Sequence, residues 1–139
     1  MGEKEILEDT TRSTGRDALK KNVQAAIALS GAIRSTLGPK GLDKLLIDDD
    51  GRTLVTNDGV TVLETAKVEH PVAKMVIGAS SLQDKIAKDG TTSTVILASE
   101  MLRNAWELVV QGIHPAVISR GFRMAEQKVV EAIDGLSLE

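Results

Sequence analysis

The run Asp89-Gly90-Thr91-Thr92-Ser93 is the segment of this sequence best suited to bind a ligand. It leads into the apolar stretch 95–110, whose spacing is typical of a helix. The start of a helix exposes backbone amides and the positive end of the helix dipole. The hydroxyls of Thr91, Thr92 and Ser93 add donors to the same space. The run therefore predicts a socket for a phosphate group.

The carboxylate of Asp89 does not fit this socket by itself, because it would repel phosphate oxygens. Two roles remain open for it from the sequence. Asp89 could cap the helix, or a divalent cation could lie between its carboxylate and the phosphates. Magnesium is the usual cation in that second role.

Two further glycine-containing loops stand out, Leu37-Gly38-Pro39-Lys40-Gly41 and Asn57-Asp58-Gly59. Glycine permits a backbone to approach a ligand closely. Each loop alone is ordinary turn chemistry, but three such loops in one chain favour a shared site. Neither a Walker phosphate loop nor a Gly-x-Gly-x-x-Gly signature occurs, so a nucleotide site would have to be built differently.

Other candidate sites are weaker. The run 48–51 resembles a calcium loop, but Leu46 stands where the first acidic ligand should be, which favours a solvated turn. His70 and His114 each precede a proline at an expected helix start, with no cysteine or carboxylate cluster at ligand spacing. No Ser-His-Asp arrangement is apparent either, so the sequence does not support covalent catalysis.

Composition favours one domain with an aliphatic core. The 139 residues are 42% hydrophobic, yet Trp106 and Phe122 are the only aromatic side chains of the Phe, Trp and Tyr types. A net charge of −3 without a basic block argues against nucleic-acid binding. No stretch approaches the roughly 20 apolar residues of a membrane span, and the N-terminus is charged where a signal peptide is apolar. The absence of cysteine fits a reducing compartment, so we expect a cytoplasmic location.

The apolar periodicity predicts a mainly α fold, a multihelical bundle with one small β-hairpin. We expect helices over about 17–37, 71–86, 90–110 and 115–136, and the hairpin over 45–55. The third of these helices is apolar around most of its circumference, which predicts a central, enclosed helix that forms a helical hairpin with the last one. Residues 1–14 are polar and aperiodic, which indicates a flexible arm or a strand that pairs only with a partner.

Several motifs in one order resemble the group II chaperonins, the thermosome and its eukaryotic cytosolic relatives. The resemblance spans roughly 15–136. The matching segments are Gly15-Arg16-Asp17-Ala18, Arg34 to Lys44, Thr56 to Gly59, His70 to Met75, Asp89 to Ser93, and Gly112 to Pro115.

The resemblance implies that 15–139 form the N-terminal part of an equatorial, ATP-binding domain, without the family's intermediate and apical domains. It implies ATP or ADP and Mg²⁺ as ligands. Leu37, Gly38 and Pro39 would contact the phosphates, as would Gly90, Thr91, Thr92 and Ser93. Asp89 would hold magnesium, and Asp58 would be the catalytic residue that helps to orient water.

The resemblance also implies which partners and how much activity to expect of this chain. Family members are ATP-dependent folding machines of two stacked rings, so the expected partners are other chaperonin subunits or further copies of this chain. Client proteins would bind only in a full-length context, and ATP hydrolysis by this chain alone should be weak or absent. The alternative is a non-catalytic structural or interaction protein derived from the equatorial domain.

Two positions depart from the family pattern beside the expected site. Lys88 stands where the family usually has glycine, and Ile86 where it usually has an acidic residue. The ammonium of Lys88 could strengthen phosphate attraction, or its side chain could block the pocket.

Overall fold

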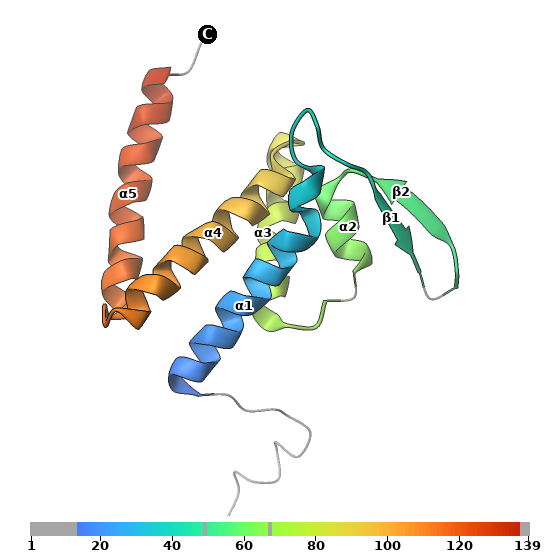
Figure 1. The fold of residues 1–139 in the computed structure, drawn as a ribbon. Helices are drawn as coiled ribbons and strands as arrows, with labels where there is room; N and C mark the ends of the chain where they lie inside the picture. The colour runs from blue at the N-terminus through green and yellow to red at the C-terminus, as the bar shows by residue number, and fades with distance from the viewer. Residues whose placement is uncertain (1–13, 49, 67, 137–139) are drawn as a thin grey trace, which may run out of the picture.

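The computed structural model describes residues 14–48, 50–66 and 68–136, and Figure 1 shows their arrangement. Nearly all of the arm expected over 1–14 lies outside these residues. The described elements confirm a mainly α fold with a two-stranded antiparallel sheet. They are α1 (Gly15–Ile33), the 3-10 turn η1 (Arg34–Thr36), β1 (Lys44–Ile47), β2 (Thr53–Thr56), α2 (Gly59–Thr65), α3 (Pro71–Ala87), α4 (Thr91–Val110) and α5 (Pro115–Leu136).

The predicted hairpin forms with Leu45 opposite Val55. Its turn is closed by the carboxylate of Asp48, whose Oδ1 accepts hydrogen bonds from the backbone amides of Asp50 and Arg52 at 3.0 and 2.8 Å. This is an Asx-type turn, in which an aspartate side chain bonds the backbone just ahead of it. The Asp48 carboxylate therefore shapes the hairpin, as the solvated-turn interpretation expects.

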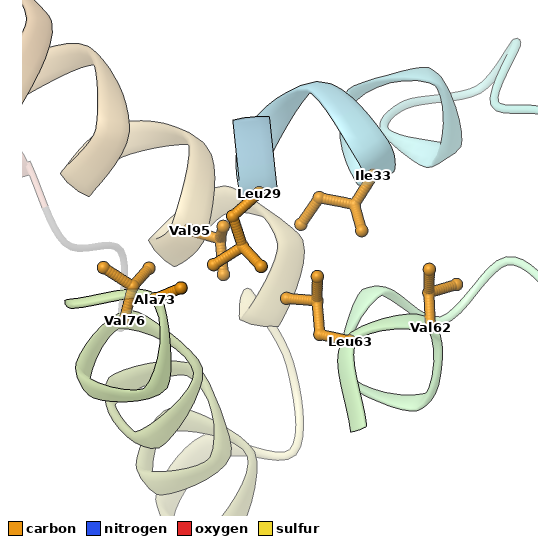
Figure 2. Close-up of a cluster of buried hydrophobic side chains, with 7 residues drawn as sticks. All are labelled: Leu29, Ile33, Val62, Leu63, Ala73, Val76 and Val95. Carbon is orange, nitrogen blue, oxygen red and sulfur yellow. The ribbon is translucent and has the colours of Figure 1, made fainter. Parts of the chain in front are cut away.

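The core lies where α1, α2, α3 and α4 meet, and it is wholly aliphatic. Figure 2 shows the side chains that fill it. They are Leu29, Ile33, Val62, Leu63, Ala73, Val76 and Val95. A buried hydrogen bond of 2.8 Å from the Ser99 hydroxyl to the Ala26 carbonyl oxygen adds a polar contact between α4 and α1.

Helix α2 was not predicted. Its sequence is rich in valine and threonine, which have modest helix propensity, and it spans only 7 residues. Two features stabilise it. The Asp58 side chain caps its first turn, and Val62 and Leu63 are buried in the core. The loop Asn57-Asp58-Gly59 therefore leads into the N-terminus of α2, with Asp58 as its N-cap residue.

The expectation that α4 is enclosed is wrong. Val95 and Ser99 are buried, but Leu97 is 64% exposed and Val110 53% exposed. The helical hairpin with α5 forms only in part, because α5 meets α4 near their connection and then diverges from it in Figure 1. Within α5 as the structure describes it, Ile118 is the one residue that is buried. Among the described residues, none of the helices has the length and apolarity needed to cross a bilayer.

Candidate phosphate-binding site

The start of α4 has open backbone donors. Its N-cap residue, Gly90, has a left-handed backbone with φ 77°, and no side chain of the described residues caps the helix. The amides of Thr91, Thr92 and Ser93 belong to the first turn and so lack an intrahelical carbonyl partner. Thr91 is buried, Thr92 half-buried and Ser93 exposed, so the turn reaches from the core to the surface.

Helix α3 holds this start in place through two side chains that sequence reasoning missed. The Ser80 hydroxyl donates a buried hydrogen bond of 3.0 Å to the Thr91 carbonyl oxygen. The side-chain amide of Gln83 donates to the Asp89 carbonyl oxygen at 3.1 Å. The only signal in the sequence was that Ser80 and Gln83 continue, at helical spacing, the face of α3 on which Ala73 and Val76 lie.

Asp89 is exposed and does not cap α4. Its Oδ1 accepts a 2.7 Å hydrogen bond from the amide of Gly90, the N-cap residue itself, and Oδ2 has no donor in the described part of the chain. No group of three or more potential metal ligands occurs among the described residues. A lone carboxylate fits magnesium, which commonly takes one or two carboxylates and fills its shell with phosphate and water oxygens.

Lys88 does not fill the socket. Its side chain is 75% exposed, and Nζ lies 4.0 Å from Oδ2 of Asp84, one turn earlier on α3. The backbone at Lys88 is left-handed, with φ 57°, as it ends α3. Glycine adopts that conformation without steric cost, which gives a physical reason for a glycine at this position.

The loop Asn57-Asp58-Gly59 packs closely against the run that begins at Asp89. A Cβ atom placed on Gly59 would lie 2.4 Å from Oγ1 of Thr92 and 3.2 Å from its Cβ, so only glycine fits without a shift. The start of α2 therefore lies against the start of α4. Asp58, which immediately precedes Gly59, is brought to the same place.

The carboxylate of Asp58 is held in its charged form. Oδ2 accepts hydrogen bonds from the hydroxyl of Thr61 at 2.6 Å and from its amide at 2.9 Å. These bonds, the Thr61 hydroxyl first, lower the pKa of Asp58 below its ordinary value, although partial burial acts in the opposite direction. The amide of Val60 and the hydroxyl of Thr91 contribute smaller reductions of the same pKa.

The loop from Leu37 to Gly41 lies at the same end of the bundle. Leu37, Gly38 and Pro39 are exposed and follow η1, which packs on α4. Figure 1 shows their loop above the end where α4 begins. The loop 57–59 is thus in direct contact with the run 89–93. The loop 37–41 is connected to them through η1, which packs on α4.

The comparisons with known proteins give one consistent result. The TCP-1/cpn60 chaperonin family matches residues 29–139. Thermosome subunit alpha of Archaeoglobus fulgidus is 50% identical over 134 residues, which is 96% of this chain and 25% of that protein. Thermosome subunit beta of Thermoplasma acidophilum is 49% identical over 132 residues, 95% of this chain and 24% of that protein.

The chain thus spans about a quarter of the length of the curated relatives that it matches. The family match covers all three loops, residues 29–33 of α1 and every later helix that the structure describes. The resemblance read from the motifs is confirmed, and the chain belongs to the TCP-1/cpn60 chaperonin family, as a segment related to the thermosome subunits of group II chaperonins.

Proposed function

We propose that this chain binds ATP or ADP with magnesium, as the nucleotide-binding segment of an ATP-dependent protein-folding ring. The observation that carries this proposal is the contact between Gly59 and Thr92. It places a charged carboxylate, Asp58, beside a helix start with open amides. A phosphate chain and its cation need both kinds of group within one small space.

Each site residue has a distinct role in this proposal. The amides and hydroxyls from Gly90 to Ser93 bind phosphate oxygens, and Leu37, Gly38 and Pro39 contact the phosphates from the other side. Asp89 holds the magnesium ion, which when bound neutralises phosphate charge. Asp58, whose lowered pKa keeps it ionised at neutral pH, accepts a hydrogen bond from a water near the γ-phosphate and helps to orient it.

We expect hydrolysis by these 139 residues alone to be weak or absent, because they span only about a quarter of the length of the thermosome subunits that they match. We propose that its partners are other chaperonin subunits or copies of itself. This fits the relatives, which are named as subunits. Client proteins would be bound only in a full-length context.

An interaction role without catalysis is the second candidate, and one observation favours it. Apolar side chains on α3 form a stripe that nothing in the described chain covers: Met75 is 73% exposed, Leu82 57% and Ile86 75%. Exposed apolar surface of this kind marks contact sites for other proteins. This role predicts assembly that is indifferent to nucleotide.

A thermal-shift titration tests the nucleotide proposal. Ligand at 100 times its dissociation constant stabilises a fold by about 2.7 kcal/mol, which corresponds to a rise of several degrees in Tm. We expect Mg-ADP and Mg-ATP to raise the Tm of the chain, and Asp89→Ala to remove that rise. Asp134→Ala is the control, since it removes an exposed carboxylate on α5, far along the chain from the site, and should leave the shift intact.

Flat titrations of the unmodified chain with both nucleotides would count against binding. A Tm rise that survives in Asp89→Ala would place the cation elsewhere. Light scattering on the same samples reports the mass in solution, so it separates nucleotide binding from assembly.

A further inference from the structure

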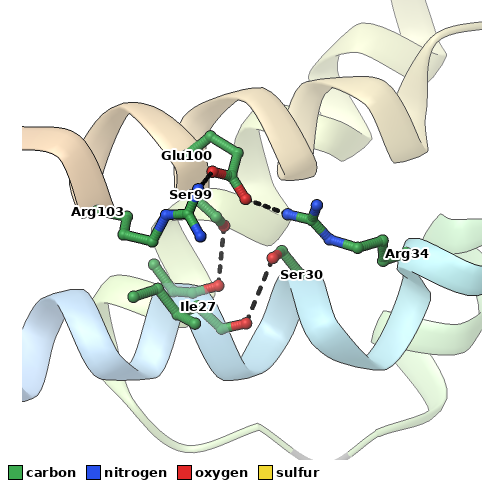
Figure 3. Close-up of polar contacts among 7 residues, drawn as sticks. Ile27, Ser30, Arg34, Ser99, Glu100 and Arg103 are labelled. Carbon is green, nitrogen blue, oxygen red and sulfur yellow. Dashed lines mark hydrogen bonds and ion pairs between the residues drawn. The ribbon is translucent and has the colours of Figure 1, made fainter.

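A charged cluster joins the end of α1 to the middle of α4, outside the phosphate socket. Figure 3 shows Glu100 of α4 between two guanidinium groups. One oxygen, Oε1, pairs with Arg34, and the other, Oε2, pairs with Arg103 on the same helix. The Glu100 side chain is only 26% exposed, while each arginine is 53% exposed.

Arg34 occupies a particular place in the chain. It is the first residue of η1, the turn that leads into Leu37, Gly38 and Pro39. Its carbonyl oxygen accepts a hydrogen bond from the amide of Leu37 at 3.3 Å. The backbone of Arg34 is therefore bonded to the first residue of the proposed phosphate loop.

The loop that follows is bonded into one unit. The amide of Leu42 donates to the Ser35 carbonyl oxygen at 2.8 Å, and the amide of Gly41 donates to that of Gly38 at 2.9 Å. A Cβ on Gly41 would lie 2.2 Å from the Thr36 carbonyl oxygen, so the loop folds tightly on itself. Because these bonds span the loop from end to end, its orientation follows that of η1.

The register between α1 and α4 is already fixed next to Glu100. Ser99 donates its buried hydrogen bond to the Ala26 carbonyl oxygen of α1. Figure 3 shows Ser99 beside the charged cluster. The turn η1 continues from the end of α1, where Thr36 is buried and its hydroxyl donates a 2.8 Å hydrogen bond to the Ile33 carbonyl oxygen. Glu100 of α4 adds a charged contact to η1 through Arg34.

We propose that Glu100 is a positioning residue for the nucleotide site. It holds Arg34, and through η1 the loop 37–41, in a fixed orientation on α4, whose first turn is the phosphate socket. Arg103 balances the remaining charge of the carboxylate. The proposal rests on the proposed function for its effect on nucleotide affinity, but not for its effect on the loop itself.

Amide hydrogen exchange and nucleotide affinity, measured on the whole chain, test this role. Exposed ion pairs contribute modestly, so we expect Glu100→Gln to speed exchange at the amides of Gly41 and Leu42 by about two- to five-fold. The dissociation constant for Mg-ADP should rise by a similar factor of about two to five. Arg34→Gln should do the same, and the double variant should be no worse than either single one.

Three variants serve as controls. Arg34→Lys keeps the charge and should retain most of the protection. Arg103→Gln should leave exchange at Gly41 and Leu42 close to that of the unmodified chain. Glu131→Gln breaks an exposed ion pair with Lys128 on α5 and should change neither measurement.

The outcomes separate this proposal from the nucleotide proposal. Faster exchange at Gly41 and Leu42 without nucleotide supports the positioning role, even in a chain that binds no nucleotide. Unchanged exchange in Glu100→Gln overturns it, whatever the affinity. Equal acceleration at all measured amides, including that of Gly51 in the hairpin, also overturns it, because that is general loosening.

Discussion

Residues at the proposed site also have structural roles, and Lys88 is the first example. Its backbone ends α3 in the left-handed region, which a side chain with a Cβ adopts only at a steric cost. Its ammonium pairs with Asp84 on its own helix. The Lys88 side chain therefore does not block the proposed site. Its left-handed backbone lowers the stability of the fold instead.

Lys88→Gly should therefore stabilise the chain. Relief of the left-handed strain is partly offset by the greater freedom of glycine in the unfolded chain, so we expect a gain of about 0.5–1 kcal/mol in the free energy of unfolding. Urea denaturation measures it. Lys88→Ala, which keeps the strained backbone and also loses the pair with Asp84, should give no gain; equal stabilisation by alanine would show that the backbone is not the cause.

Asp58 caps α2 as well as belonging to the proposed site, and two substitutions separate these roles. Asp58→Ala removes the cap and should cost about 1 kcal/mol of stability. Asp58→Asn keeps an N-cap side chain without the charge, so it should cost less at pH 7. If both variants lose the same stability, the charge and not the cap is what matters.

The lowered pKa of Asp58 gives a pH dependence of known sign. A carboxyl whose pKa falls on folding stabilises the fold above its ordinary value of 3.8, and that contribution is lost as the pH falls through the lowered folded value. We therefore expect the stability difference between the unmodified chain and Asp58→Asn to be constant near neutrality. It should shrink below about pH 4 in denaturation curves.

At the scale of elements, the site depends on how closely the starts of α2 and α4 approach. Helix α2 is short and has little intrinsic stability, so its place is set by Val62 and Leu63 in the core and by the fit of Gly59 against Thr92. This close packing brings Asp58 to the start of α4, the proposed phosphate site. A small displacement of α2 would thus separate the two halves of the site.

Gly59→Ala tests this approach. A methyl group 2.4 Å from Oγ1 of Thr92 must displace that side chain or the helix, and we expect a loss of about 1–3 kcal/mol of stability, as for other overpacked positions. Thr92→Ala removes Oγ1, so Gly59→Ala should cost less in that background. A purely additive double variant in thermal unfolding would show that the two residues are not in contact.

At the scale of the whole molecule, the residues that the structure describes bury an aliphatic core and leave much apolar surface exposed. The stripe on α3 is one part of it. A groove of about 290 Å³ between α1, α4 and α5 is another, with an almost entirely apolar lining that includes Leu19, Leu102, Trp106 and Phe122. Surfaces of this kind favour association with other proteins.

We expect the chain to associate with itself at micromolar concentration. Replacing Met75, Leu82 and Ile86 together with glutamine should shift it toward the monomer. Because all three side chains are mostly exposed, each change should alter stability by no more than about 0.5 kcal/mol. Sedimentation equilibrium measures the mass. A monomer for the unmodified chain, or an unchanged oligomer in the triple variant, would contradict the role given to this stripe.

The sequence by itself determined the long helices, the hairpin and the identity of the three loops, because apolar periodicity, proline, glycine and Asx turns act over a few residues. Tertiary structure decided the rest. Helix α2 exists because Val62 and Leu63 find a core to enter, and α4 is half exposed because its apolar circumference meets neighbours on only part of its surface. The contact of Gly59 with Thr92 and the pair of Glu100 with Arg34 join residues far apart in the chain. Local patterns carry no information on such distant pairs, since only the packing of whole helices brings them together.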